Sequence, residues 1–210
     1  MLYYLADVLK QFWGPFRLLQ SHALLLAGGA FSAAFLALFL LPRLWNRLPR
    51  DRGKVLCKDM DGMKSAGKPT GAGFWVTLII LPVILVFAPL KFWDLAAVAM
   101  LYFAMLFGYL DDKAVVPWGE LKKGLLDAVC ALAIAAFIFL GHAERETPDA
   151  ALGMICWFPF VKSIVYVPAV IYIPVAAFIL WFTMNATNCS DGVDGLAGTL
   201  TVITLAMLAV

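Results

Sequence analysis

The chain has 210 residues, of which 63% are hydrophobic and only 14% are charged. Soluble domains average about 45–50% apolar and about 25% charged residues, so this composition excludes an ordinary soluble domain and indicates an all-α polytopic membrane protein. The formal net charge of +2 says little by itself, and we expect no nucleic-acid partner. The four cysteines form no CxxC pair, which argues against a disulfide framework or a zinc site: Cys57, Cys130, Cys156 and Cys189.

Residues 1–18 are amphipathic, with large apolar side chains set against Asp7, Lys10 and Arg17. They are too polar for a membrane span, and they lack the basic start and the cleavage site of a signal peptide. We therefore expect an interfacial helix here.

Five apolar segments follow, each close to the ~20 residues that cross the hydrocarbon core. We predict spans at residues 22–41 (ended by Pro42), 72–90, 93–110, 124–141 and 166–184. A sixth apolar segment begins at Leu196 and continues to Val210, which is short for a span. We expect a single integral-membrane domain over residues 1–210, cut inside its sixth span.

Lys and Arg concentrate on one side of these spans. The loops after the first and third spans hold eleven of them, against three in the loops on the other side. Cytoplasmic loops carry this excess, so the N-terminus is expected outside and residues 185–198 on the cytoplasmic side. In the outer loop 142–165, two β-rich runs flank Lys162-Ser163 and predict a short β-hairpin that turns there.

Three polar stretches fall on the cytoplasmic side. The first, Lys64-Ser-Ala-Gly-Lys-Pro-Thr-Gly-Ala-Gly73, precedes the second span. Gly71 and Gly73 permit a tight backbone and Thr70 adds a hydroxyl, so the loop is able to direct N–H groups at phosphate. The plainer interpretation is a flexible loop that enters a helix.

The second stretch is Gly108-Tyr-Leu-Asp-Asp-Lys113, at the inner end of the third span. Adjacent carboxylates repel each other unless a cation is near, which suits a Mg²⁺ site or a general base. The plainer interpretation is a polar helix end that faces water. Lys122 and Lys123 follow, and they fit either a phosphate contact or a purely positive-inside role.

The third stretch, residues 185–198, carries polar residues at three-residue spacing. They are Asn185, Asn188, Asp191 and Asp194. On a regular α-helix they would fan over about half of the surface, so they converge only where the helix breaks, and Gly192 and Gly195 are the expected places. The stretch also contains two N-glycosylation sequons. A segment on the cytoplasmic side is not glycosylated, so we interpret both sequons as accidental. Carboxylates and amides that flank an apolar span usually mark a substrate or ion site.

The run Asn185-Ala-Thr-Asn-Cys-Ser-Asp-Gly-Val-Asp-Gly-Leu-Ala197 resembles the signature of bacterial phospho-N-acetylmuramoyl-pentapeptide transferases, in the polyprenyl-phosphate N-acetylhexosamine-1-phosphate transferase superfamily. Gly108-Tyr-Leu-Asp-Asp112 and Gly67-Lys-Pro-Thr-Gly-Ala-Gly73 resemble two earlier motifs of that family, in the same order. The resemblance covers the whole chain, as the N-terminal portion of a roughly ten-span enzyme. The family's third acidic residue and His-rich motif would lie beyond Val210, so the chain alone is expected to be inactive. The loop also departs from the family, which usually has Lys where Ser65 stands.

The resemblance implies transfer of phospho-N-acetylmuramoyl-pentapeptide from its UDP carrier to undecaprenyl phosphate, with Mg²⁺, giving lipid I and UMP in peptidoglycan synthesis. It implies that Asp111 is the base that deprotonates the lipid phosphate, that Asp112 is a second catalytic residue, and that Asp112 and Asn188 lie at the metal. The implied substrate-binding residues are Lys64, Thr70, Lys123, Asn188, Asp191, Gly192, Val193 and Asp194. A homodimer in the bacterial inner membrane, with a cytoplasmic active site, also fits the family.

Two other functions remain open. A sister enzyme that moves another sugar phosphate, such as N-acetylglucosamine-1-phosphate, would share these motifs. A transporter with intramembrane carboxylates would place acids near mid-span and show an internal repeat. The acids are expected at span ends on one face, and no repeat is visible, which argues against a transporter.

Overall fold

The computed structural model describes residues 1–48, 50, 71–114, 116, 118–145, 153–156, 165–190 and 196–208. Within them, four helices are long and apolar enough to cross a membrane, and the sheet has two strands. This confirms the predicted class, an all-α polytopic membrane protein. The chain forms two compact units, residues 1–92 with 105–118 and residues 93–104 with 119–210. The single membrane domain stays a prediction.

The N-terminal segment forms two short helices instead of the one interfacial helix that we expected. The first is α1 (Leu2–Leu9) and the second is the 3-10 helix η1 (Gly14–Gln20). Between them Trp13 is extended, with φ −154° and ψ 119°. Pro15 follows and has no backbone N–H to continue an α-helix, so the chain turns back here.

The first span, α2 (His22–Leu44), runs through Pro42 and does not end before it. The predicted end at residue 41 is therefore wrong. Proline removes one helical donor and crowds the carbonyl four residues earlier, so the helix ends two residues after Pro42. Arg43 also caps this end, because its guanidinium donates to the Phe39 carbonyl at 2.8 Å. A turn of 3-10 helix, η2 (Trp45–Arg47), follows.

The second span is shorter than expected. Helix α4 (Ala72–Phe87) has 16 residues, which gives a length of about 24 Å against the ~30 Å of a hydrocarbon core. Its N-cap is Gly71, whose φ of +68° favours a residue without Cβ. This confirms the prediction of a tight backbone at Gly71.

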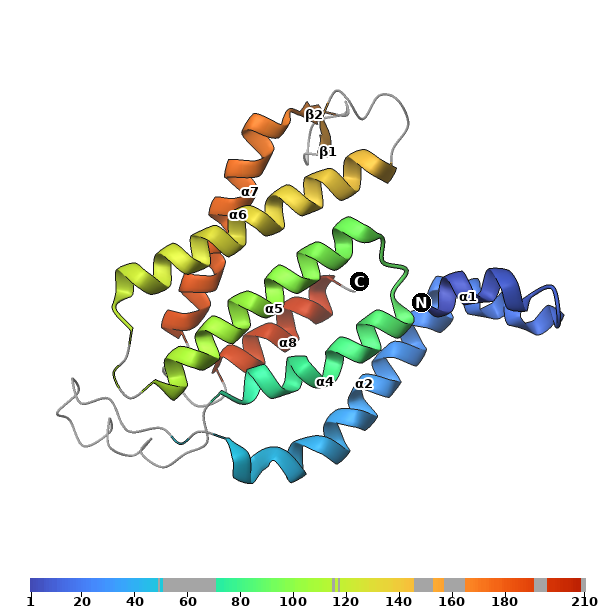
Figure 1. Cartoon of the computed structure of the whole chain (residues 1–210), viewed down its shortest axis with the longest axis horizontal. Coiled ribbons are helices and arrows are strands. Elements are labelled where there is room, and N and C mark those ends of the chain that lie inside the picture. The colour runs from blue at the N-terminus through green and yellow to red at the C-terminus, as the bar shows by residue number, and fades with distance from the viewer. Residues whose placement is uncertain are drawn as a thin grey trace. The chain divides into compact units, whose positions relative to one another are not determined.

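Helices α2 and α4 pack side by side in the first unit (Figure 1). The start of α2 meets the end of α4, where a Cβ on Gly28 would lie only 2.9 Å from the Phe87 ring. The Met1 ammonium donates to the Leu85 and Val86 carbonyls at 3.0 Å. The N-terminus and the end of α4 therefore lie at the same end of this unit, in agreement with the predicted topology.

The second unit is built on the packing of α6 (Glu120–Arg145) against α7 (Ala169–Ser190), as Figure 1 shows. The buried stripe of α6 consists of Cys130, Ala131, Ile134 and Ala135. Small side chains let helix backbones approach closely, and this is a common interface in membranes. The two helices correspond to the fourth and fifth predicted spans. Helix α6 extends beyond both predicted limits, whereas α7 begins three residues after the predicted start and continues beyond the predicted end.

A small hairpin connects α6 to α7, as predicted. Strand β1 (Met154–Cys156) pairs with β2 (Val165–Val167) in antiparallel fashion. The register does not fit a two-residue turn at Lys162-Ser163. Such a turn would pair Cys156 with the residue four positions after Val165, which is its observed partner. This expected partner would lie at the start of α7, where the chain is already helical.

The third span, α5 (Phe92–Lys113), contributes to both units. In the second unit Trp93 stacks on Phe137 of α6, with ring centroids 5.9 Å apart. A Cβ on Gly141 would lie 3.3 Å from the Trp93 Cβ, so a small residue suits this contact. The last helix, α8 (Leu196–Leu208), begins where the sixth apolar segment was predicted.

Candidate active site

The Asp111–Asp112 pair lies in the last turn of α5, at the span end where the sequence placed it. Asp111 Oδ1 accepts a hydrogen bond from the backbone N–H of Trp118 at 2.7 Å, and this contact is partly buried. Asp112 is exposed. The helix dipole disfavours negative charge at a C-terminal end, and a backbone N–H or a cation offsets that cost. A site with two carboxylates here is therefore suited to a cationic ligand.

The start of α4 lies beside the end of α5. Phe74 stacks on Tyr109 with ring centroids 4.4 Å apart and planes at 18°. Tyr109 is two residues before Asp111, so this stack brings the Gly71 helix start and the carboxylate pair to one end of the first unit. The first turn of α4 has backbone N–H groups without helical partners, and these donors suit phosphate oxygens.

Two predicted residues of the same loop, Lys64 and Thr70, lie outside the described residues. Gly73, which was expected to permit a tight backbone together with Gly71, is instead part of the regular helix α4. Its carbonyl accepts a hydrogen bond from the Thr77 hydroxyl at 2.7 Å. The positive φ before α4 that favours glycine therefore occurs at Gly71.

In the second unit, the start of α6 meets the end of α7. The Trp181 indole N–H donates to the Gly124 carbonyl at 2.8 Å, and the Asn185 amide donates to the Trp181 carbonyl at 2.8 Å. Lys123 precedes Gly124 directly. The structure thus brings the start of α6, with Lys123, to the helix end that carries the asparagines.

Asn185 and Asn188 belong to the last turns of α7, which continues to Ser190. The three-residue spacing predicts a broken helix start over this stretch, and for these two residues the prediction is wrong, because both lie in a continuous helix. Helix α7 is described as far as Ser190 and α8 from Leu196, so the predicted break points Gly192 and Gly195 lie outside the described residues. The predicted site residues Asp191, Gly192, Val193 and Asp194 lie outside the described residues.

Asp127 is a polar residue that the sequence analysis missed. It lies inside the α6 span, one turn beyond Lys123, and is half-buried. The Lys123 ammonium attracts its carboxylate. The expectation that acids lie only at span ends is therefore incomplete. A signal was present, because a carboxylate within an apolar span usually has a functional partner.

The donor set at the end of α5 fits a magnesium ion. Mg²⁺ takes oxygen ligands and is typically held by one or two carboxylates together with substrate phosphates. Asp111 and Asp112 offer two adjacent carboxylates. The part of the chain that the structure describes contains no cluster of three or more His, Cys, Asp or Glu.

Long apolar helices with polar groups gathered at their ends define an integral-membrane protein with a polar site at the ends of its spans. Residues 95–210 match the family described as Glycosyl transferase family 4. The chain belongs to that family.

Curated relatives carry the name phospho-N-acetylmuramoyl-pentapeptide-transferase. The chain is 39% identical over 198 residues to the relative from Treponema pallidum (strain Nichols), an alignment that covers 94% of this chain and 52% of the relative. It is 31% identical over 234 aligned positions to the relative from Gemmatimonas aurantiaca, covering 99% of this chain and 58% of the relative. The chain therefore spans about half the length of the curated relatives that it matches.

Proposed function

We propose that the protein transfers phospho-N-acetylmuramoyl-pentapeptide from UDP to undecaprenyl phosphate. The observation that carries this proposal is the similarity of nearly the whole chain to enzymes of that name. One feature of each unit supports it. In the first unit a carboxylate pair lies beside the open donors of a helix start, and in the second unit a lysine accompanies the asparagines of α7.

The reaction is a phosphoryl transfer. An oxygen of the lipid phosphate attacks the β-phosphorus of the UDP-sugar, the bond from that phosphorus to the bridging oxygen breaks, and UMP leaves. Asp111 takes the proton from the lipid phosphate. The Trp118 N–H holds its carboxylate in a fixed orientation, which is what a general base requires.

Asp112 supplies the second carboxylate, and with Asn188 it would hold Mg²⁺. When bound, Mg²⁺ neutralises charge on the diphosphate. Asp112 is exposed beside Asp111, so it is able to reach a ligand outside the helix. Phosphoryl transfer depends mainly on positioning and on charge stabilisation, and two neighbouring carboxylates with different surroundings suit that division of roles.

The nucleotide side of the site is assigned to Lys123 and to the stretch Asp191-Gly-Val-Asp194. Lys123 contacts the donor phosphates and Asp127 positions its ammonium. Thr70 and Lys64 approach the nucleotide from the loop before α4. We further propose that the protein works as a homodimer in the bacterial inner membrane, with this site on the cytoplasmic side.

Release of UMP tests the proposed activity. Membranes that contain the full-length protein are given UDP-N-acetylmuramoyl-pentapeptide, undecaprenyl phosphate and Mg²⁺. UMP should appear only when the lipid phosphate is present. An intact, folded protein that releases no UMP refutes the proposal. If UDP-N-acetylglucosamine gives UMP with the lipid phosphate and UDP-N-acetylmuramoyl-pentapeptide does not, the protein has the sister activity instead.

A further inference from the structure

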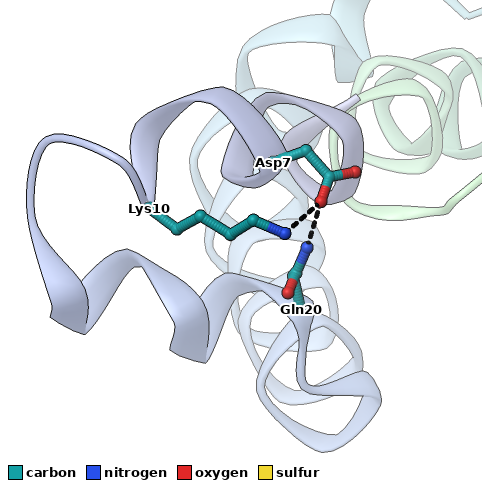
Figure 2. Close-up of polar contacts among 3 residues, drawn as sticks. All are labelled: Asp7, Lys10 and Gln20. Atoms are coloured by element: carbon teal, nitrogen blue, oxygen red, sulfur yellow. Dashed lines mark hydrogen bonds and ion pairs between the residues drawn. The ribbon is translucent and has the colours of Figure 1, made fainter.

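The N-terminal helices α1 and η1 form a hairpin that a polar clasp holds closed (Figure 2). Asp7 Oδ1 accepts hydrogen bonds from Lys10 Nζ and from Gln20 Nε2, each at 2.7 Å. Lys10 follows α1 and Gln20 ends η1, so one carboxylate oxygen ties the two helices together. The clasp pairs two of the charged side chains of this segment with each other.

One side of α1 packs against the protein. Ala6 is fully buried, and Leu2 and Leu9 are half-buried. Tyr3 stacks on His22 at the start of α2, with ring centroids 6.0 Å apart. These contacts fix the hairpin to the first turn of the first span.

The other side of α1 is exposed and apolar. Tyr4, Leu5 and Val8 are 46%, 50% and 56% exposed. At 100° per residue they lie within about 100° of each other around the helix, which is the width of an apolar stripe. Ala6 lies outside this arc. Helix α1 therefore has two apolar sides, and the protein covers only one of them.

The turn of the hairpin continues this apolar surface. Phe12 is 80% exposed and Trp13 is 63% exposed. Large aromatic side chains with a polar edge, such as tryptophan and tyrosine, gather at the boundary between lipid headgroups and acyl chains. The most exposed side chains of the segment are thus of the kind that this boundary accepts.

The exposed surface continues directly into a membrane span. Only Ser21 separates η1 from α2. Helix α2 is long and apolar enough to cross a membrane, so a hairpin joined directly to its first residue lies at the depth of the headgroup boundary. This position favours lipid over a protein partner as the occupant.

We propose that the α1–η1 hairpin is a membrane-interface anchor that lies flat at the headgroup boundary, with Tyr4, Leu5, Val8, Phe12 and Trp13 inserted into lipid. Apolar burial provides the attachment, because the clasp pairs Asp7 with Lys10 and leaves Arg17 as the remaining charged side chain of the segment. Attachment should therefore depend little on anionic lipid. This role does not depend on the proposed enzymatic activity.

Fluorescence quenching of Trp13 tests where the hairpin lies. The protein is placed in nanodiscs of zwitterionic lipid, and the emission of Trp13 is taken as the difference between wild type and Trp13→Phe. Lipids brominated near the glycerol end of the acyl chain should quench this emission more than lipids brominated near the methyl end, and aqueous iodide should quench it least. Strong quenching by iodide alone places the hairpin in water, and quenching by none of the three places it under protein. Either result overturns the proposal.

A double substitution tests what holds the hairpin to the membrane. Leu5→Ser with Val8→Ser removes two inserted side chains, and each is worth roughly tenfold or more in attachment. Trypsin cleavage at Lys10 and Arg17 in nanodiscs should rise by at least about tenfold, equally with zwitterionic and with anionic lipid. Leu121→Ser, at a leucine exposed at the start of α6, is the matched control and should leave cleavage at these sites unchanged. Unchanged cleavage in the double variant, or protection that requires anionic lipid, refutes the anchor.

Discussion

The contact between α2 and α4 gives a sharp prediction about packing. Replacing a helical glycine by alanine adds about 1 kcal/mol of helix propensity at either Gly28 or Gly29. At Gly28 the new methyl would lie 2.9 Å from Phe87 Cε1, whereas at Gly29 it would lie 3.4 Å from Phe87 Cβ, which is ordinary contact. The overpacking cost of roughly 1–3 kcal/mol therefore applies to Gly28 alone. We expect Gly28→Ala to be less stable than Gly29→Ala by that amount.

Unfolding of the purified protein by SDS, followed by circular dichroism, measures the difference. Because both variants gain the same propensity, their difference isolates the contact with the Phe87 ring. A third variant, Gly28→Ala with Phe87→Leu, removes the ring atom that the methyl meets, so the two changes should couple favourably by about 1 kcal/mol or more. Equal stability of the two alanine variants, or additive effects in the double variant, would show that this contact is not formed.

Three further predictions concern the site and the hairpin. Asp111→Asn should lower the rate of UMP release by about 10²–10⁴. The fold should stay intact, because the amide oxygen still accepts the Trp118 N–H, and Asp94→Asn at the other end of α5 should leave the rate unchanged. A near-normal rate in Asp111→Asn excludes Asp111 as the base. Trp181→Phe should cost about 1 kcal/mol in the same unfolding assay, because the Gly124 carbonyl loses its donor, and no cost would refute that bond. Hydrogen bonding to Lys10 holds the pKa of Asp7 below its ordinary value of 3.8, so the clasp is fully formed above that pH. The clasp is lost as the pH falls through the lowered pKa, and a change in the Trp13 difference emission should report this loss.

The positions of the helices could be predicted from apolar runs, but several of their ends could not. The fifth span was predicted to stop at residue 184, yet α7 continues to Ser190. The polar residues beyond the apolar run bond back to the helix itself. The Asn185 amide donates to the Trp181 carbonyl, and the Thr187 hydroxyl donates to the Thr183 carbonyl, each at 2.8 Å. Hydropathy does not register that a helix satisfies these polar groups with its own carbonyls, so it did not predict that the helix continues past the apolar run.

The candidate site was predictable in its residues more than in its arrangement. The sequence indicated Asp111 and Asp112 as a pair at a span end, because adjacent carboxylates beside an apolar run are costly. It contained no sign that Phe74 and Tyr109 stack, and this contact is what places the start of α4 beside the pair. The sites of the loop before α4 and of residues 191–194 stay predictions.

The short length of α4 has a consequence for the lipid around it. A helix of about 24 Å leaves a deficit of about 6 Å against a hydrocarbon core of about 30 Å. A bilayer accommodates a short apolar helix by thinning beside it. At the end that starts with Gly71, such thinning brings lipid headgroups toward the level of the Asp111–Asp112 pair. The proposed transfer activity should consequently depend on acyl-chain length, with short-chain bilayers favouring access of the lipid phosphate to Asp111, its proposed base.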